Sequence, residues 1–215
     1  MKILVEAGHG GTCFGHYFTP GKRSPGKKTS QDEGVFEGEF DREVASLVTK
    51  DLNTIGIPAE FLNPGTLNAL LLTRKLYINK LAKKEDIVLL SIHANASGNK
   101  WSNASGARMF IRPCGWTKER IKNYKLSKEL ALGIEKGFRS NPYIPYGVRP
   151  LLEKYFKIIS VNCPAVLCET VFMTNKIDIS WANSVNGKEH ISSTICDAVK
   201  EWYFNTTPAP FTRSV

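Results

Sequence analysis

The sequence predicts a single α/β domain with a mixed, mostly parallel sheet that is flanked by helices on both faces. Short apolar runs, typical of buried strands, alternate along the chain with segments whose apolar residues recur at helical spacing. The chain has 215 residues, which fits one large domain, and no shift in composition marks a second one. We therefore expect one folded domain over residues 1–205 and a flexible tail over 206–215.

Five apolar runs are predicted to be strands. The run Ile87–Ile92 is almost continuously apolar, which is typical of a strand buried on both faces. The segment 151–159 has no clear pattern and is ambiguous. The predicted strands are 3–7, 58–62, 87–92, 108–111 and 165–169.

Four further segments have the 3.6-residue period of a helix. Gly56 follows the first of them and is a typical helix stop. Between the first strand and this helix, Gly8–Gly34 holds seven glycines and two prolines. Loops of this length inside a domain are usually functional. The predicted helices are 40–55, 67–83, 127–138 and 190–204, and the inner face of the second is set by Leu70, Leu71, Arg74, Tyr77, Ile78 and Leu81.

The composition narrows the class of protein. The formal net charge of +9 favours contact with polyanions, but no nucleic-acid motif accompanies it, so we expect no nucleic-acid partner. Five cysteines without a CxxC pair suggest free thiols in a reducing compartment. No apolar run reaches the roughly 18–20 residues of a membrane span. Because Met1 leads directly into the first strand, we see no signal peptide and expect synthesis in the cytoplasm.

Three polar side chains follow apolar strands at the points where the chain leaves the predicted sheet. They are His9, His93 and Glu169. Each alone is compatible with an ordinary hydrogen-bonded loop residue or a partly buried acid. Ligands of α/β sheets bind at the carboxyl ends of the strands, so the three together predict a cation site on one rim.

A catalytic zinc commonly takes three protein ligands, and helix geometry selects the third one. With ~100° per residue, the apolar stripe of the helix that starts at Phe40 centres about 40° from that residue. Glu37 then falls at about 60°, toward the sheet, and Glu39 at about 260°, toward solvent. We therefore predict His9, Glu37 and His93 as ligands of one Zn²⁺ per chain. A rival set, His9 with Cys13 and His16, lies within one loop.

Several motifs resemble those of the zinc N-acetylmuramoyl-L-alanine amidases of bacterial cell-wall lysins and phage endolysins. Ile3–Gly11 is similar to the opening strand with its glycine-flanked histidine, and Ser91–Ala96 to the second histidine motif. Glu37–Arg42 resembles the segment of the ligand glutamate, with Asp41 where the family commonly has Asn. Pro164–Asn175 resembles the segment of the catalytic glutamate, with Thr170 in place of a frequent Gly. The match runs in order from residue 3 to about 203.

This resemblance implies a catalytic domain with about six strands, in which Glu169 is the catalytic acid and base. It also implies that Asp41 supports a zinc ligand. The expected reaction is zinc-dependent hydrolysis of the amide between N-acetylmuramic acid and L-alanine in peptidoglycan. An endolysin-like, bacteriolytic role of phage origin would place the protein in the host cytoplasm until its release to the cell wall.

Substrate contacts are expected from the loops around this site. Asn95 lies in the second histidine motif, and Trp101 offers an aromatic face to a sugar ring. Gly147–Arg149 is similar to a segment that lines the family's substrate groove, so Arg149 is a candidate partner for a stem-peptide carboxylate. The surplus of lysines suggests attachment to anionic polymers of the cell envelope.

Three alternatives remain open at this point. The same ligands would serve another zinc amidohydrolase or an exopeptidase. A non-catalytic cell-wall-binding module would keep the fold without turnover, although all four functional positions hold competent residues. A nucleic-acid binder is suggested by charge alone, and its binding would collapse with salt. The sequence leaves the oligomeric state and the host range undetermined.

Overall fold

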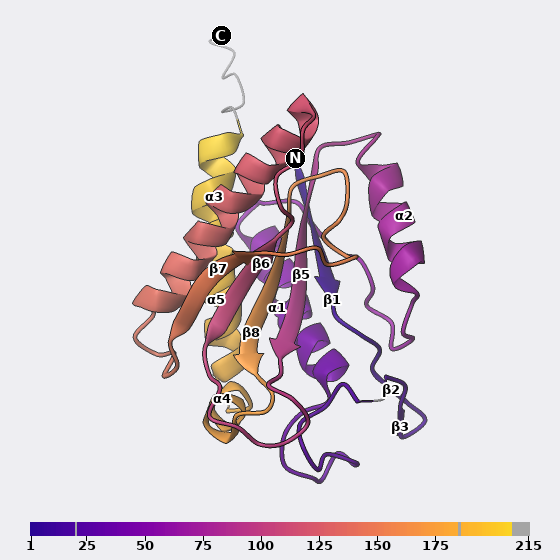
Figure 1. Cartoon of the computed structure of the whole chain (residues 1–215), viewed down its shortest axis with the longest axis vertical. Coiled ribbons are helices and arrows are strands. Elements are labelled where there is room, and N and C mark those ends of the chain that lie inside the picture. Colours follow the sequence, from indigo (N-terminus) through magenta and orange to yellow (C-terminus); the bar gives the residue numbers. More distant parts are fainter. Residues whose placement is uncertain (20, 185, 208–215) are drawn as a thin grey trace.

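The sheet is mixed and has six strands in the order β4-β1-β5-β8-β6-β7 (Figure 1). The computed structural model describes residues 1–19, 21–184 and 186–207. The neighbours β4, β1, β5 and β8 are parallel to one another, β6 is antiparallel to β8, and β7 is parallel to β6. The predicted fold class is therefore confirmed. The strands are β1 (Lys2–Ala7), β4 (Ala59–Phe61), β5 (Ile87–Asn95), β6 (Ala107–Ile111), β7 (Val148–Glu153) and β8 (Ala165–Phe172).

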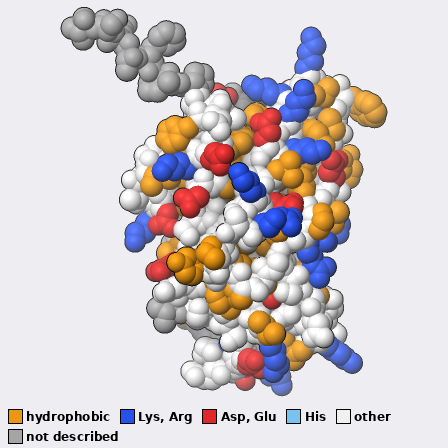
Figure 2. Space-filling view, turned by 90° about the vertical axis from the view of Figure 1, so that its left-hand side faces the viewer, with side chains coloured by type: hydrophobic (Ala, Val, Ile, Leu, Met, Phe, Trp, Pro, Cys, Tyr) orange, Lys and Arg blue, Asp and Glu red, His pale blue; other side chains and the backbone are white. Residues whose placement is uncertain are grey.

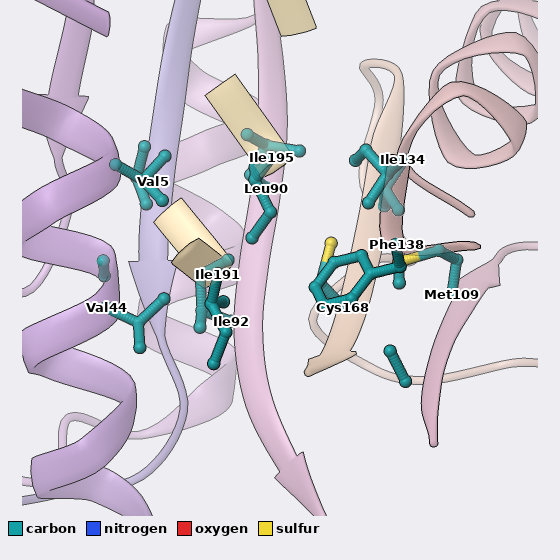
Figure 3. Packing of buried hydrophobic residues seen from close by; sticks show 14 of the residues in the cluster. Val5, Val44, Leu90, Ile92, Met109, Ile134, Phe138, Cys168, Ile191 and Ile195 are labelled. Carbon is teal, nitrogen blue, oxygen red and sulfur yellow. The ribbon is translucent and has the colours of Figure 1, made fainter. Parts of the chain in front are cut away.

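Helices cover the two faces of the sheet unequally. Figure 1 shows α1 (Glu37–Thr54), α3 (Lys118–Ser140) and α5 (Gly187–Thr206) along one face and α2 (Leu71–Leu81) on the other. The main core fills the space between the three helices and the sheet, as Figure 3 shows for Val5, Val44 and Ile195. A smaller core around Leu89 and Ile158 lies under α2 and the segment after β7.

The helix α1 follows the predicted apolar stripe. Phe40, Val44, Val48 and Leu52 are all buried against the sheet and α5. The helix ends just before Gly56, whose φ of 82° lies in the left-handed region that glycine adopts without strain. The packing of this helix along the sheet brings its acidic first turn to the carboxyl edge of the sheet, where the site described below lies.

The predicted inner face of α2 is wrong in part. Only Arg74 and Ile78 are buried along this helix, whereas Leu70, Leu71 and Tyr77 are exposed. The helix is also shorter than the predicted range 67–83. Only a narrow side of the helix contacts the sheet. On this side Arg74 is buried and forms an ion pair with Glu6 on β1. The leucines stay in contact with solvent beside the site.

Other differences concern the ends of elements and one short helix. α3 begins nine residues before its predicted start because Thr117 caps it and its first turns are charged, which hides their period. The ambiguous segment 151–159 begins with the last residues of β7 (Val148–Glu153) and continues as irregular chain. The helix α4 (Lys176–Ala182), capped by Asn175, was not predicted. Of the expected tail 206–215, residues 208–215 lie outside the described part of the chain.

The long loop folds back over the start of α1. It contains a two-stranded antiparallel hairpin of β2 (Thr12–Cys13) and β3 (His16–Tyr17). Tyr17 stacks on Phe36 with 4.4 Å between ring centroids, and its hydroxyl accepts a hydrogen bond from the Gly38 N–H at 2.9 Å. All five cysteines are free thiols. Within the described residues, no helix is long and apolar enough to cross a membrane.

A buried ion pair fastens α2 to the sheet directly beneath the carboxyl edge. Arg74 binds the Glu6 carboxylate on β1, and the Ser91 hydroxyl on β5 donates to the same carboxylate. Glu6 is completely buried and Arg74 almost so. Both carboxylate oxygens thus have a partner, which a charge at this depth requires.

Replacing Arg74 by methionine should lower the free energy of unfolding by about 3–5 kcal/mol, because it leaves the Glu6 carboxylate buried without its counter-charge. Chemical denaturation of both proteins would measure the difference. Lys80→Met on the exposed side of α2 is the matched control and should change stability by less than about 0.5 kcal/mol. A loss below 1 kcal/mol in Arg74→Met would contradict this account of the ion pair.

Candidate metal centre and active site

Three side chains from separate elements converge at the carboxyl edge of the sheet. His9 Nε2 lies 3.3 Å from Glu37 Oε1, and His93 Nδ1 lies 3.2 Å from the same oxygen. One potential ligand atom from each residue lies within 4.8 Å of the others, and this is the one such group of His, Cys, Asp or Glu within the described residues. The structure thus brings together the three residues predicted from strand ends and helix phase.

Close backbone packing positions the two histidines. His9 follows β1 with a φ of 58°, in the left-handed region, and its carbonyl accepts a hydrogen bond from Arg42 at 2.8 Å. A Cβ added to Gly8 would lie 2.4 Å from His93 Cε1, so the His93 ring occupies the space that glycine leaves free. Thr170, in the place of a frequent glycine, donates to the His93 carbonyl at 3.2 Å.

Glu37 is a buried carboxylate on the first turn of α1. Burial alone would raise its pKa, but hydrogen bonds and charge interactions with His9 and His93 lower the pKa to about 2. For His93, burial alone would lower the pKa, and the hydrogen bond to Glu37 together with the charge of Glu169 raises it above its ordinary value. Glu37 Oε2 is buried and has no hydrogen-bond partner within the described residues. The two histidines therefore favour the ionised form of this carboxylate, which offers an oxygen donor beside two imidazoles.

Glu169 lies directly beside this group on the neighbouring strand. It pairs in register with His93 across β5 and β8. Burial raises the pKa of Glu169 to about 7, against the opposing effect of His93. Its Oε2 is buried and has no hydrogen-bond partner among the described residues. A carboxyl group with a pKa near neutrality can both take up and release a proton, as general acid–base catalysis requires.

Asp41 lies one helical turn after Glu37 and is completely buried. A Cβ on Gly8 would come within 2.7 Å of Asp41 Oδ2 and 2.5 Å of His93 Nδ1, so Asp41 lies beside the His93 ring. Neither of its oxygens has a hydrogen-bond partner in the described chain. Burial and the charge of Glu37 raise its pKa well above the ordinary value. A protonated Asp41 has the shape and one donor of the asparagine that the related motif commonly carries.

The three predicted substrate contacts have different surroundings. The Asn95 side chain closes its own turn by accepting from the Ala96 N–H at 2.8 Å. Trp101 lies under Lys176, with 5.1 Å from Nζ to the ring centroid. The Arg149 guanidinium covers the Phe172 ring, with 4.8 Å from Cζ to the centroid. Their contacts with substrate remain predictions.

The rival ligand set does not assemble. Cys13 and His16 face each other across the hairpin of the long loop, and His16 is exposed. The group that converges contains His9 but neither of these two residues.

Two features of the site escaped the sequence analysis. A cavity of about 600 Å³ joins His9 and His93 to the exposed leucines 70–72 at the start of α2. The run of three leucines in the sequence indicates this cavity, but Leu70 and Leu71 were predicted to lie on the inner face of the helix. Lys22 places its Nζ 4.0 Å from Glu37 Oε2, and nothing in the sequence distinguishes this lysine from the others of the loop.

Comparison of this chain with known protein families and structures gives an assignment that is consistent with the geometry of the site. The family model described as N-acetylmuramoyl-L-alanine amidase matches residues 3–201. The chain belongs to the N-acetylmuramoyl-L-alanine amidase family. The predicted reaction, hydrolysis of the amide between N-acetylmuramic acid and L-alanine in peptidoglycan, is the activity of this family.

The alignments with three similar proteins each cover nearly the whole of this chain. A Buchnera aphidicola protein that is named as an N-acetylmuramoyl-L-alanine amidase is 25% identical over 94% of this chain and 96% of its own length. LytC of Bacillus subtilis, an N-acetylmuramoyl-L-alanine amidase, is 27% identical over 94% of the chain but only 35% of its own length. The crystal structure of an N-acetylmuramoyl-L-alanine amidase from Clostridium difficile 630 superposes with a TM-score of 0.73 at 20% identity, over 96% of this chain and 98% of that one. At 20% identity, the similarity to this crystal structure supports the fold alone.

Proposed function

We propose that this amidase depends on one zinc ion per chain, held by His9, Glu37 and His93. The observation that supports this most strongly is their convergence beside Glu169. Two imidazole nitrogens and one carboxylate oxygen are a common donor set of catalytic zinc. Glu37 Oε2, buried and without a hydrogen-bond partner among the described residues, fits a bound cation. The missing side chain at Gly8 lets the His93 ring lie beside this group.

Zinc, when bound, supplies a Lewis acid for the scissile carbonyl and lowers the pKa of water. Glu169 accepts a proton from the water molecule whose oxygen attacks the carbonyl carbon. When the carbon–nitrogen bond breaks, Glu169 returns this proton to the nitrogen of L-alanine, which leaves as an amine. Burial raises the pKa of Glu169 to about 7, which suits a group that both accepts and donates a proton.

The activity is tested on purified peptidoglycan. We expect new amino termini of L-alanine without new reducing sugar ends, loss of this release after treatment with a chelator, and recovery with added zinc. An exopeptidase would instead free single amino acids from the end of the stem, and a cell-wall-binding module would bind without releasing amines. Full activity in the metal-free protein would contradict zinc dependence.

A lytic, endolysin-like role is the finer part of the proposal. It places the amidase in the cytoplasm where it is made, in the host cytoplasm if it comes from a phage, until its release to the wall. The net charge of +9 supports attachment to anionic envelope polymers. Lys and Arg side chains are spread among acidic ones on the side of the molecule in Figure 2, with many along its right-hand edge. Lysis of intact cells that does not weaken with added salt would count against such attachment.

A further inference from the structure

A row of side chains that can carry charge crosses the α2 face of the sheet, outward from the converging His9, Glu37 and His93. His93 on β5 pairs with Glu169 on β8, Glu169 pairs with Arg108 on β6, and Arg108 pairs with Arg149 on β7. Residues paired in register on neighbouring strands project from the same face. This face carries Leu167 and Phe110 of the smaller core, each two residues from a member of the row. In Figure 1 no described helix lies in front of the lower parts of β6, β7 and β8.

Among the described residues, neither of the two arginines has an acidic partner. None of the ion pairs within the described part of the chain includes Arg108 or Arg149. Arg108 Nε is buried and lacks a hydrogen-bond partner in the same residues. Burial and the adjacent charge of Arg149 both lower the pKa of the Arg108 guanidinium. Two like charges side by side, one of them partly desolvated, are a destabilising arrangement that an anion would relieve.

Arg149 is also held in place. Its Nε donates to the Ser105 carbonyl at 2.8 Å, while its guanidinium covers the Phe172 ring. The backbone around both partners is fastened by the buried carboxylate of Asp178. This carboxylate accepts from the Ser105 hydroxyl at 2.6 Å and from the N–H groups of Gly106 and Phe172 at 3.2 and 3.1 Å.

The strands of the two arginines are held close together at this point. The Ala107 N–H donates to the Gly147 carbonyl at 3.0 Å. Gly106 has a φ of 102°, and a Cβ there would come within 2.7 Å of the Gly147 oxygen, so only glycine fits. Such support is typical of side chains that are oriented before a ligand arrives.

We propose that Arg108 and Arg149 together bind a carboxylate of the stem peptide and so determine which stems this amidase accepts. The inference rests on the proposed function, because it names the substrate feature that the same site reads. Adjacent guanidinium groups match the two oxygens of a carboxylate through charge-assisted hydrogen bonds. The row places Arg149 two strand spacings, roughly 10 Å, from Glu169. An extended peptide covers this distance in about three residues, so the carboxylate lies within the first three residues of the stem.

The test uses synthetic muramyl tripeptides with free carboxylates and with each carboxylate converted in turn to an amide. For the wild-type protein, one of these amidations should lower kcat/KM by about 10- to 100-fold. The double variant Arg108→Gln, Arg149→Gln should lose the same factor on the free acid, mainly through KM, and should match the wild type on that amide. Arg139→Gln, on the exposed side of α3, is the control of the same residue type and should behave as the wild type.

Several outcomes would overturn the inference while the proposed function stands. One is equal hydrolysis of all substrates by the wild type, and another is an equal loss by the double variant on acid and amide, which would indicate a structural role. Binding of the free stem tripeptide, measured by calorimetry, needs no turnover. If the wild type hydrolysed no substrate, the proposed function would fail, and the inference would still be decided by whether the acid binds more tightly than the amide.

Discussion

Replacing Glu169 by glutamine is expected to lower kcat by about 10²–10⁴-fold, the range that a positioned acid–base group contributes. Glutamine keeps the shape of the side chain but cannot take up a proton from the attacking water. The variant should still bind one zinc ion per chain, because Glu169 is outside the three side chains that converge at Glu37 Oε1.

The measurement combines release of L-alanine amines from a soluble muropeptide with zinc content determined by mass spectrometry. Glu129→Gln, an exposed acid on α3, is the control and should keep both values. If the Glu169→Gln variant retained most of its turnover, this result would contradict the proton transfers assigned to Glu169. One that loses its zinc would show that Glu169 belongs to the metal site itself.

Replacing Glu37 by glutamine is expected to abolish both zinc binding and activity. The carboxylate is the one anionic ligand of the proposed set, and its depressed pKa shows how strongly the two histidines favour its charge. A neutral amide would reduce zinc affinity by more than about 100-fold, beyond the 10–100-fold cost of changing groups outside the ligand set.

Zinc affinity by competition with a chelator dye would measure this effect. Glu39→Gln provides a close control, since it changes the same residue type two positions along the same helix turn. Its side chain is outside the converging group, so the variant should bind zinc as the wild type does. Equal zinc affinity in the Glu37 and Glu39 variants would contradict the assignment made from helix phase.

The convergence of His9, Glu37 and His93 was predictable because local patterns specify these residues. His9 and His93 follow apolar strands, and parallel strands bring their carboxyl ends to one edge. Glu37 was separated from Glu39 by the period of α1 alone, and it is the buried one of the two. The proposed catalytic role of Glu169 came from the resemblance to the amidase family, because no periodicity could indicate it.

What the sequence could not predict depends on contacts between distant segments. β6 follows β5 in the chain, yet β8 lies between them in the sheet. The order of the strands in the sequence therefore does not indicate that Arg108 and Glu169 are neighbours in the sheet. The inner face of α2 was misjudged for the same reason. Arg74 was correctly placed on this face, where it pairs with an acid 68 residues away. Leu70 and Leu71 resembled core residues but are exposed.

The most direct test of the central proposal is an anomalous difference map collected at the zinc absorption edge from crystals of the zinc-loaded protein. We predict a single peak per chain, within bonding distance of His9, Glu37 and His93 and with Glu169 beside its remaining open side. A peak on any other set of side chains, or no peak in crystals that contain zinc in equimolar amount, would contradict the account.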